Sequence, residues 1–387
     1  MAETERDPDS SSPPRTWRLP RKFARLGSGV VLAYADLSPA SEPADGQQSR
    51  PYATAQPPTL VLVHGYTNDA DSWADVVTRL RELLPDHRFL VPDLRGHGAS
   101  GLPDGQGWHH DPILEFSMAR QADDIAALLE ALGIGGATVV GHSMGALVAQ
   151  QLAADHPALV SRLVLVSTTS DAQGTPFLSD WLVGVIEDQW RPALVAKGFA
   201  WPEEALAATP ADADPEAVSW LQQYWNYYPL TPERSTLEVA RRASRLPLAT
   251  WIGALQGILG TSALPAFDAP TLVLWGTQDS FFRRASQESL ISQLSGRRAN
   301  PGMGAPGGNR PTAIWKQYGR LPLPDDGIQL DDLGHNLTWD APAEVAADVA
   351  AFVTTGRPTS TWFRTDAPAE PHRIIGEPEA AVMVVQG

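Results

Sequence analysis

The most constraining feature of this chain is the pentapeptide GHSMG at residues 141–145, together with its flanks. Residues 137–140 form a short, partly β-branched apolar run that predicts a buried strand. Residues 146–155 carry small and apolar side chains at helical spacing. A G-x-S-x-G motif between a strand and a helix is typical of a nucleophile elbow, a sharp turn that presents a reactive serine. We therefore expect Ser143 to stand clear of a sheet, at the positive end of the following helix.

The two glycines of this motif have a steric purpose. The strand and the helix approach each other closely at so sharp a turn, and the serine backbone is strained, so its neighbours must be nearly free of side chain. The bare motif also occurs by chance in unrelated chains. Its flanks and the further residues described below are what make it informative.

Composition narrows the classes of function. The 387 residues suffice for one large domain with an insertion, or for two domains. A net charge of −16 argues against nucleic acid or an anionic membrane as a partner. The absence of cysteine excludes a thiol nucleophile, disulfides and cysteine-ligated metals. Residues 1–15 lack the apolar core of a signal peptide, and no apolar run approaches the ~18 residues of a membrane span. We expect a soluble, cytoplasmic protein.

The order of the predicted elements indicates an α/β fold with a doubly wound, mostly parallel sheet. Continuous apolar strands are expected at residues 59–63, 88–92, 163–166 and 271–275, and helices at residues 72–84, 117–132 and 343–353. Residues 23–36 are predicted to form a hairpin and residues 327–330 a last short strand. Residues 296–327 form a Gly/Pro/Asn-rich insertion of unassigned role. Strands that alternate with helices imply a parallel sheet, whose ligands bind at the carboxyl ends of the strands.

Residues 171–264 interrupt this alternation. They contain six of the thirteen tryptophans, many prolines and helical segments, but no convincing buried strand. We predict that they form a helical cap inserted between two strands of one core, which comprises residues 21–170 and 265–356. Residues 1–20 are predicted to be a disordered tail, and residues 357–387 a C-terminal tail.

With these pieces in place, the chain resembles the α/β-hydrolase superfamily, in its cap-bearing, serine esterase-like branch. The matching segments are HGY at residues 64–66, DLRGHG at residues 93–98, the elbow at residues 141–145, the strand-ending Asp279, and Gly334-His335. They occur in the order of the family and cover roughly residues 23–355 apart from insertions. The resemblance implies the α/β-hydrolase fold and an activity that needs neither a cofactor nor a metal ion.

The resemblance also implies roles for single residues. Ser143 becomes the nucleophile, His335 the base that takes its proton, and Asp279 the carboxylate that fixes the tautomer of His335. The backbone N–H groups of Tyr66 and Met144 form the oxyanion hole that stabilises the tetrahedral intermediate.

One departure from the family leaves the choice of acid open. A proline commonly stands three residues after this aspartate, whereas this chain has Phe282 there. Asp171, just past the strand predicted at residues 163–166, occupies the acid position of some other members and is the alternative to Asp279. Residues 109–111 (HHD) are a candidate metal cluster, but consecutive ligands without a second cluster favour a solvated loop.

The aromatic residues of the cap suggest a substrate pocket over Ser143. Candidate pocket residues are His142, Trp181, Trp225 and Phe281, and they favour an apolar or aromatic small molecule as substrate. The alternative is that the tryptophans form the small core of the cap itself.

Taken together, these residues predict a serine hydrolase that cleaves a carboxylic ester, lactone or thioester through an acyl-enzyme on Ser143. A carbon–carbon bond hydrolase, a proline-type aminopeptidase and an acyltransferase use the same triad and are enzymatic alternatives. A ligand-binding receptor on the same fold is the non-enzymatic alternative, because a fold does not determine a function. The sequence makes no prediction about the oligomeric state.

Overall fold

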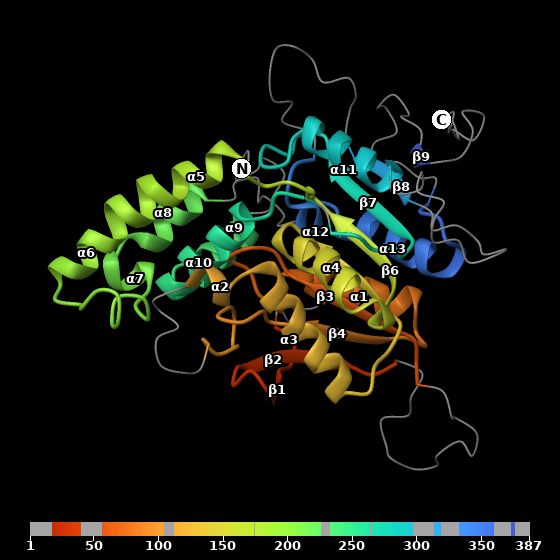
Figure 1. Cartoon of the computed structure of the whole chain (residues 1–387), viewed down its shortest axis with the longest axis horizontal. Helices are drawn as coiled ribbons and strands as arrows, with labels where there is room; N and C mark the ends of the chain where they lie inside the picture. The colour runs from red at the N-terminus through yellow and green to blue at the C-terminus, as the bar shows by residue number, and fades with distance from the viewer. Residues whose placement is uncertain are drawn as a thin grey trace, which may run out of the picture.

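The computed structural model describes residues 18–39, 56–103, 112–173, 175–225, 233–263, 265–296, 313–318, 333–359 and 373–375. Within them, a nine-stranded sheet runs through the centre of the molecule and helices cover both of its faces (Figure 1). The order of the strands is β1-β2-β4-β3-β5-β6-β7-β8-β9. The predicted α/β fold with a mostly parallel, doubly wound sheet is confirmed.

The centre of the sheet is parallel and its edges are antiparallel. The parallel strands are β4 (Arg88–Pro92), β3 (Thr59–Val63), β5 (Ala137–His142), β6 (Val160–Val166), β7 (Thr271–Gly276) and β8 (Ala313–Tyr318). At one edge lies the hairpin of β1 (Lys22–Arg25) and β2 (Val31–Leu37), and at the other β9 (Arg373–Ile375). The predicted hairpin and the four strands predicted as continuous apolar runs are all present.

Helices pack on both faces of the sheet. On one face lie α1 (Ala74–Leu83) and α13 (Pro342–Thr355), and on the other α3 (Met118–Ala131), α4 (Met144–Asp155) and α11 (Arg284–Gly296). Short helices are η1 (Ala70–Trp73), α2 (Pro112–Glu115), η3 (Pro157–Leu159) and α12 (Leu337–Asp340). Ser117 caps α3 as its position predicts, because its side chain accepts the backbone N–H of Arg120.

The side chains of β3 show why the central strands are apolar throughout. Leu60 and Leu62 belong to the core under α1 and α13, whereas Val61 and Val63 belong to the core under α3 and α4. All four side chains are fully buried. Because successive side chains point to opposite faces and both faces are covered, the strand has no polar side.

Between β6 and β7 the described chain forms helices joined by turns and loops, with no strand. The helices are α5 (Pro176–Trp181), the π-helical η4 (Leu182–Trp190), α6 (Arg191–Ala196), α7 (Pro210–Ala213), α8 (Ala217–Tyr224), α9 (Glu233–Ala243) and α10 (Leu248–Leu259). Figure 1 shows this helical insertion as a lobe beside the sheet. A helical insertion is therefore found between two strands of one sheet, as predicted.

Two hydrogen bonds join the helical insertion to the loop after β3. The hydroxyl of Tyr66 donates to the backbone carbonyl of Trp251 at 2.7 Å. The indole Nε1 of Trp225 donates to Oγ1 of Thr67 at 2.9 Å. Both bonds are buried, so the position of this loop depends on the sheet and on the insertion together.

Two strands were missed by the sequence analysis, β8 and β9, of which β9 lies within the predicted C-terminal tail. β8 lies inside residues 296–327, where an insertion was predicted, because Lys316 and Gln317 interrupt the apolar pattern. In the structure Lys316 is buried, and its Nζ forms an ion pair with the carboxylate of Asp348 on α13 at 2.7 Å. A charged side chain is tolerated in a buried strand when it is paired in this way. The strand predicted at residues 327–330 lies outside the described residues.

The tails differ from prediction where they are described. Residues 18–20 were assigned to the N-terminal tail, yet the backbone N–H of Leu19 donates to Asp71 at 2.8 Å. At the other end, Thr359 donates from its backbone N–H to Asp348 at 2.9 Å. Both segments are therefore held on the core, although the sequence shows no apolar pattern there.

Replacing Gly145 with alanine is expected to lower the free energy of unfolding by about 3 kcal/mol or more. A Cβ at this position would lie 2.3 Å from the carbonyl oxygen of Val63 and 2.4 Å from that of His64. Both obstacles are backbone atoms of the sheet and its loop, so neither moves without disturbing β3. Urea denaturation followed by circular dichroism measures the effect.

Gly184→Ala, in η4, is the matched control. No atom lies within 4 Å of the Cβ that it would add. This variant should be neutral or stabilising by up to about 1 kcal/mol, because alanine favours a helix over glycine. Equal stability of the two variants would contradict the close packing described for Gly145.

Candidate active site

Ser143 lies at the turn between β5 and α4. Its φ of 53° falls in the left-handed region, which a serine rarely adopts and which marks a strained backbone. A Cβ on Gly141 would lie 2.4 Å from the carbonyl oxygen of Gly145, so glycine is required for this approach of strand and helix. The backbone N–H of Ser143 donates to Val166 on β6 at 2.9 Å. The strand–turn–helix predicted for residues 137–155 is present.

His335 and Asp279 form a buried pair beside this turn. Nδ1 of His335 lies 2.9 Å from Oδ2 of Asp279. An ionised carboxylate only accepts hydrogen bonds, so Nδ1 is the donor; in the neutral imidazole this tautomer has its lone pair on Nε2. The other carboxylate oxygen accepts the backbone N–H groups of Phe281 at 2.9 Å and Phe282 at 3.0 Å. These bonds fix the orientation of the carboxylate toward the imidazole.

The hydrogen bond from the backbone N–H of Phe282 is a consequence of having phenylalanine, and not the common proline, three residues after Asp279. A proline at this position has no N–H and would be unable to donate to Asp279. In this chain Phe282 donates to the carboxylate and also lines the cavity around Ser143.

The alternative acid, Asp171, does not contact His335. It is exposed, and its carboxylate accepts the backbone N–H of Gln173 at 3.0 Å. Of the two candidate carboxylates, the structure brings Asp279 to His335.

His142 lines the cavity and contacts the backbone of His335. Its Nε2 lies 2.9 Å from the backbone carbonyl of His335. A carbonyl oxygen only accepts, so Nε2 carries the proton and Nδ1 has a lone pair. Burial, with a smaller contribution from His335, lowers the pKa of His142 to about 3. The side chain is therefore neutral near pH 7 and holds the segment that carries His335.

The backbone N–H groups expected to form the oxyanion hole flank Ser143. Met144 is the first residue of α4, so its N–H has no partner within the helix. Tyr66 follows Gly65, which approaches the elbow so closely that an added Cβ would lie 3.1 Å from the Cβ of Ser143. β3 and β5 are adjacent, and the order of strands reverses at this point of the sheet. Such a reversal is where ligands bind in open parallel sheets.

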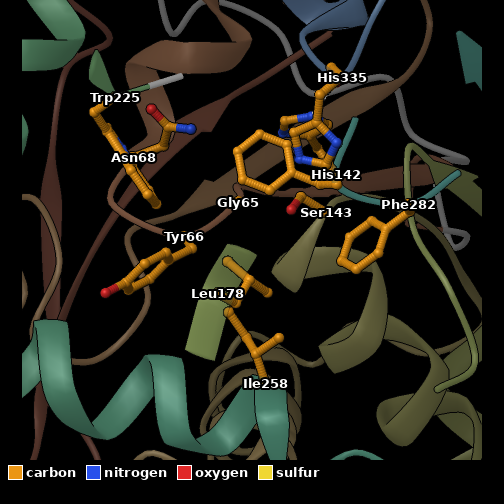
Figure 2. Close-up of a pocket in the computed structure, with 11 residues that line it drawn as sticks. Gly65, Tyr66, Asn68, His142, Ser143, Leu178, Trp225, Ile258, Phe282 and His335 are labelled. Atoms are coloured by element: carbon orange, nitrogen blue, oxygen red, sulfur yellow. Dashed lines mark hydrogen bonds between the residues drawn. The ribbon is translucent and has the colours of Figure 1, made fainter. Parts of the chain in front are cut away.

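Ser143 and His335 line an open cavity, which has a volume of about 390 Å³ when the solvent space at its opening is included (Figure 2). Its apolar lining comes from Leu178, Trp225, Ile258, Phe281 and Phe282. Figure 2 shows Leu178 and Ile258 on one side of Ser143, and Trp225 and Asn68 on another. Helices of the insertion supply Leu178 and Ile258, and Trp225 directly follows α8. The helical insertion therefore builds much of the wall that faces the serine.

The predicted pocket residues divide into two groups. His142, Trp225 and Phe281 line the cavity, whereas Trp181 does not. Trp181 lies behind Trp225, with their ring centroids 4.4 Å apart, and it also stacks on Trp251 at 6.1 Å. It belongs to the core of the insertion and does not line this cavity. The aromatic residues thus contribute side chains both to the cavity wall and to the core of the insertion.

Sequence reasoning missed four lining residues. The sequence offered a signal for two of them, because Asn68 stands two residues after the HGY segment and Phe282 three residues after Asp279. Leu178 and Ile258 carry no sequence signal, since only the packing of the insertion brings them to Ser143.

Two further buried histidines lie under the loop after β3. The rings of His64 and His97 are 5.1 Å apart. His64 accepts the backbone N–H of Leu94 at Nε2 and bonds the carbonyl of Gly65 through Nδ1. Burial lowers the pKa of His64 to about 4 and that of His97 to about 3. Both are structural and neutral near pH 7.

Two classes of site are absent from the described part of the chain. Its residues contain no group of three or more His, Cys, Asp or Glu that could hold a metal ion. None of its helices combines the length and the hydropathy needed to cross a membrane. The candidate cluster at residues 109–111 lies outside the described residues.

Comparison with known proteins decides the family. Residues 58–300 match the family model described as alpha/beta hydrolase fold. The chain belongs to the α/β-hydrolase fold family. An esterase from Exiguobacterium antarcticum shares the fold of this α/β-hydrolase with a TM-score of 0.58 and 14% identity. The superposition covers 86% of this chain and 99% of the esterase.

Curated relatives match shorter segments of this α/β-hydrolase. A protein of Mycobacterium tuberculosis, described as uncharacterized, is 38% identical over 112 residues, which are 28% of this chain and 29% of that protein. Lipase LipV of the same organism is 35% identical over 124 residues, 32% of this chain and 42% of the lipase. The chain thus spans less than half the length of these relatives.

Acid is expected to destabilise this α/β-hydrolase through its buried histidines. His64, His97 and His142 have an ordinary pKa of 6.5, and folding lowers it to about 4 or 3. Between these values the unfolded chain binds more protons than the folded one, so stability falls as the pH falls. At pH 5 the loss amounts to about 2 kcal/mol for each histidine relative to pH 7.

Two buried carboxylates, Asp69 and Asp124, work in the opposite direction, because folding raises the pKa of each. Burial raises the pKa of Asp69 to about 6, which favours the folded state at pH 5 by about 1 kcal/mol. The expected net result is therefore a loss on the order of a few kcal/mol from pH 7 to pH 5, measured by urea denaturation at both values. Equal unfolding free energies at pH 7 and pH 5 would show that these histidines are not buried and neutral.

Proposed function

We propose that this α/β-hydrolase is a serine hydrolase that cleaves a carboxylic ester, lactone or thioester through an acyl-enzyme on Ser143. The observation that carries the proposal is the buried hydrogen bond between Nδ1 of His335 and Asp279, in the wall of the cavity that contains Ser143. In the neutral imidazole this bond places the proton on Nδ1 and the lone pair on Nε2, which is the tautomer that a general base requires.

In the proposed reaction, Ser143 is the nucleophile, His335 transfers the proton, and two backbone N–H groups bind the oxyanion. His335 takes the proton of Ser143 as Oγ attacks the substrate carbonyl carbon, and the carbonyl oxygen becomes an oxyanion. The N–H groups of Tyr66 and Met144 donate to this oxyanion, each worth about 3 kcal/mol in the transition state. The bond to the leaving group then breaks, and His335 returns its proton to the departing alcohol or thiol. Water attacks the acyl-enzyme by the same route and releases the acid.

The cavity supports a small-molecule substrate that is largely apolar or aromatic. Its lining is dominated by Leu178, Ile258, Trp225 and two phenylalanines. In this proposal the helical insertion acts as a cap that supplies the substrate-facing wall and keeps bulk water from the acyl-enzyme. The likeness to a lipase and to an esterase also favours an ester bond.

Three variants test the proposal with p-nitrophenyl esters and lactones as substrates. Ser143→Ala removes the nucleophile, and its kcat is expected to fall at least about a thousandfold. Asp279→Asn is expected to cost about as much, because an amide at this position holds His335 in the wrong tautomer. Asp171→Asn is the control and should stay within about twofold of wild type, since Asp171 does not contact His335.

A larger loss in Asp171→Asn than in Asp279→Asn would assign the acid to Asp171. Turnover that survives in Ser143→Ala would exclude the acyl-enzyme. A folded wild type that binds these compounds and turns over none of them would favour the receptor alternative.

A further inference from the structure

The cavity contains one side-chain amide that the proposed mechanism does not use. Asn68 is only 2% exposed and lines the same cavity as Ser143 and His335. Its side-chain amide forms no hydrogen bond with the described residues: Oδ1 is buried without a partner, and Nδ2, which is directed toward the cavity, donates to none of them. Buried polar atoms are almost always paired in folded proteins, so an unpaired amide in a binding cavity points to a ligand that pairs with it.

The loop that carries Asn68 is held in one conformation. The backbone N–H of Asn68 donates to the carbonyl of Gly65 at 3.2 Å, and this bond closes a tight turn. Within this turn Thr67 has a φ of 63°, an uncommon value for a β-branched residue. Oγ1 of Thr67 accepts the indole N–H of Trp225, which fixes the turn from the side of the insertion. The amide of Asn68 is therefore placed by the sheet and the insertion together.

The orientation of the amide is visible in the close-up of the cavity. Figure 2 shows Asn68 beside Trp225, with its amide nitrogen directed toward the space that Ser143, His335 and Tyr66 surround. The hydroxyl proton of the neighbouring Tyr66 is not directed at a substrate, because it is donated to the carbonyl of Trp251. The Nε2 proton of His142 is likewise used by the carbonyl of His335. Asn68 thus offers an amide donor that these neighbours do not supply.

We propose that Asn68 determines substrate specificity by donating from Nδ2 to an oxygen of the substrate other than the scissile carbonyl. The substrate class is an ester whose acyl or alcohol part carries a carbonyl, hydroxyl or ether oxygen on an otherwise apolar skeleton. This inference rests on the proposed function. An apolar substrate displaces water from the amide and leaves it unpaired, whereas an oxygenated one restores a hydrogen bond.

Isosteric pairs of esters test this role. For the acyl part, p-nitrophenyl methoxyacetate is compared with p-nitrophenyl butanoate. For the alcohol part, 2-methoxyethyl butanoate is compared with n-butyl butanoate, with acid release followed in a pH-stat. Within each pair an ether oxygen replaces a methylene group. The ratio of kcat/KM for the oxygenated and the plain ester is measured in wild type and in Asn68→Leu, so that intrinsic reactivity cancels between the two proteins.

In at least one pair, the ratio is expected to be about tenfold or more higher in wild type than in Asn68→Leu. The control is Gln256→Leu on α10, whose Oε1 is also buried without a described partner but which does not line the cavity. Its ratios should equal those of wild type. Ratios that are unchanged by Asn68→Leu in both pairs would overturn the inference while leaving the proposed function intact, because the esters are still cleaved. Wild type that cleaves none of the four esters would overturn the inference, which names esters as the substrates, and turnover of the lactones would then test the proposed function separately.

Thermal unfolding separates a binding role from a structural one. If Asn68 is present for the substrate, Asn68→Leu and Asn68→Ala should unfold at the same temperature as wild type or higher, since they remove an unpaired polar group. A clear loss of thermal stability in both variants would show that the fold requires the amide, and would overturn the specificity role.

Discussion

The arrangement of this site depends on one steric constraint, the near contact between the backbone of the elbow and that of the neighbouring strand. Gly145 approaches the carbonyl oxygens of Val63 and His64 so closely that no side chain fits between them. This contact holds Ser143 in its strained conformation and places it beside the loop after β3. A strain of this kind persists only where the surrounding packing determines it, and here the fully buried central strands supply that packing.

The sheet and the helical insertion contribute different parts of the site. Loops at the carboxyl ends of β3, β5 and β7 carry Tyr66, Ser143 and Asp279, so the groups assigned to the chemistry stand on the rigid centre of the fold. The insertion contributes apolar side chains and, through Trp225, a hydrogen bond to the loop that presents Asn68. In this account the loops of the sheet carry the reacting groups, and the insertion together with Asn68 determines which ester is accepted, as is common when loops and insertions vary on a constant scaffold.

A structural feature of this protein can be predicted from the sequence when residues close together in the chain determine it. Strands buried on both faces, such as β3, leave a continuous apolar run, and the elbow leaves a motif, so both were predictable. β8 was not, because the burial of Lys316 depends on Asp348 from a distant helix. Trp181 and Trp225 look alike in sequence, and only the folding of the insertion separates the core residue from the lining residue. Tertiary contacts between distant segments therefore account for what sequence could not show.

The central claim is that Ser143 is an activated nucleophile, and intact-protein mass spectrometry after reaction with a fluorophosphonate probe tests it most directly. Such a probe labels a serine only when a neighbouring base and an oxyanion hole activate it. The account predicts a single adduct on wild type, located on the peptide that contains Ser143, and none on Ser143→Ala. A folded wild type that stays unlabelled, or an adduct on another residue, would contradict it.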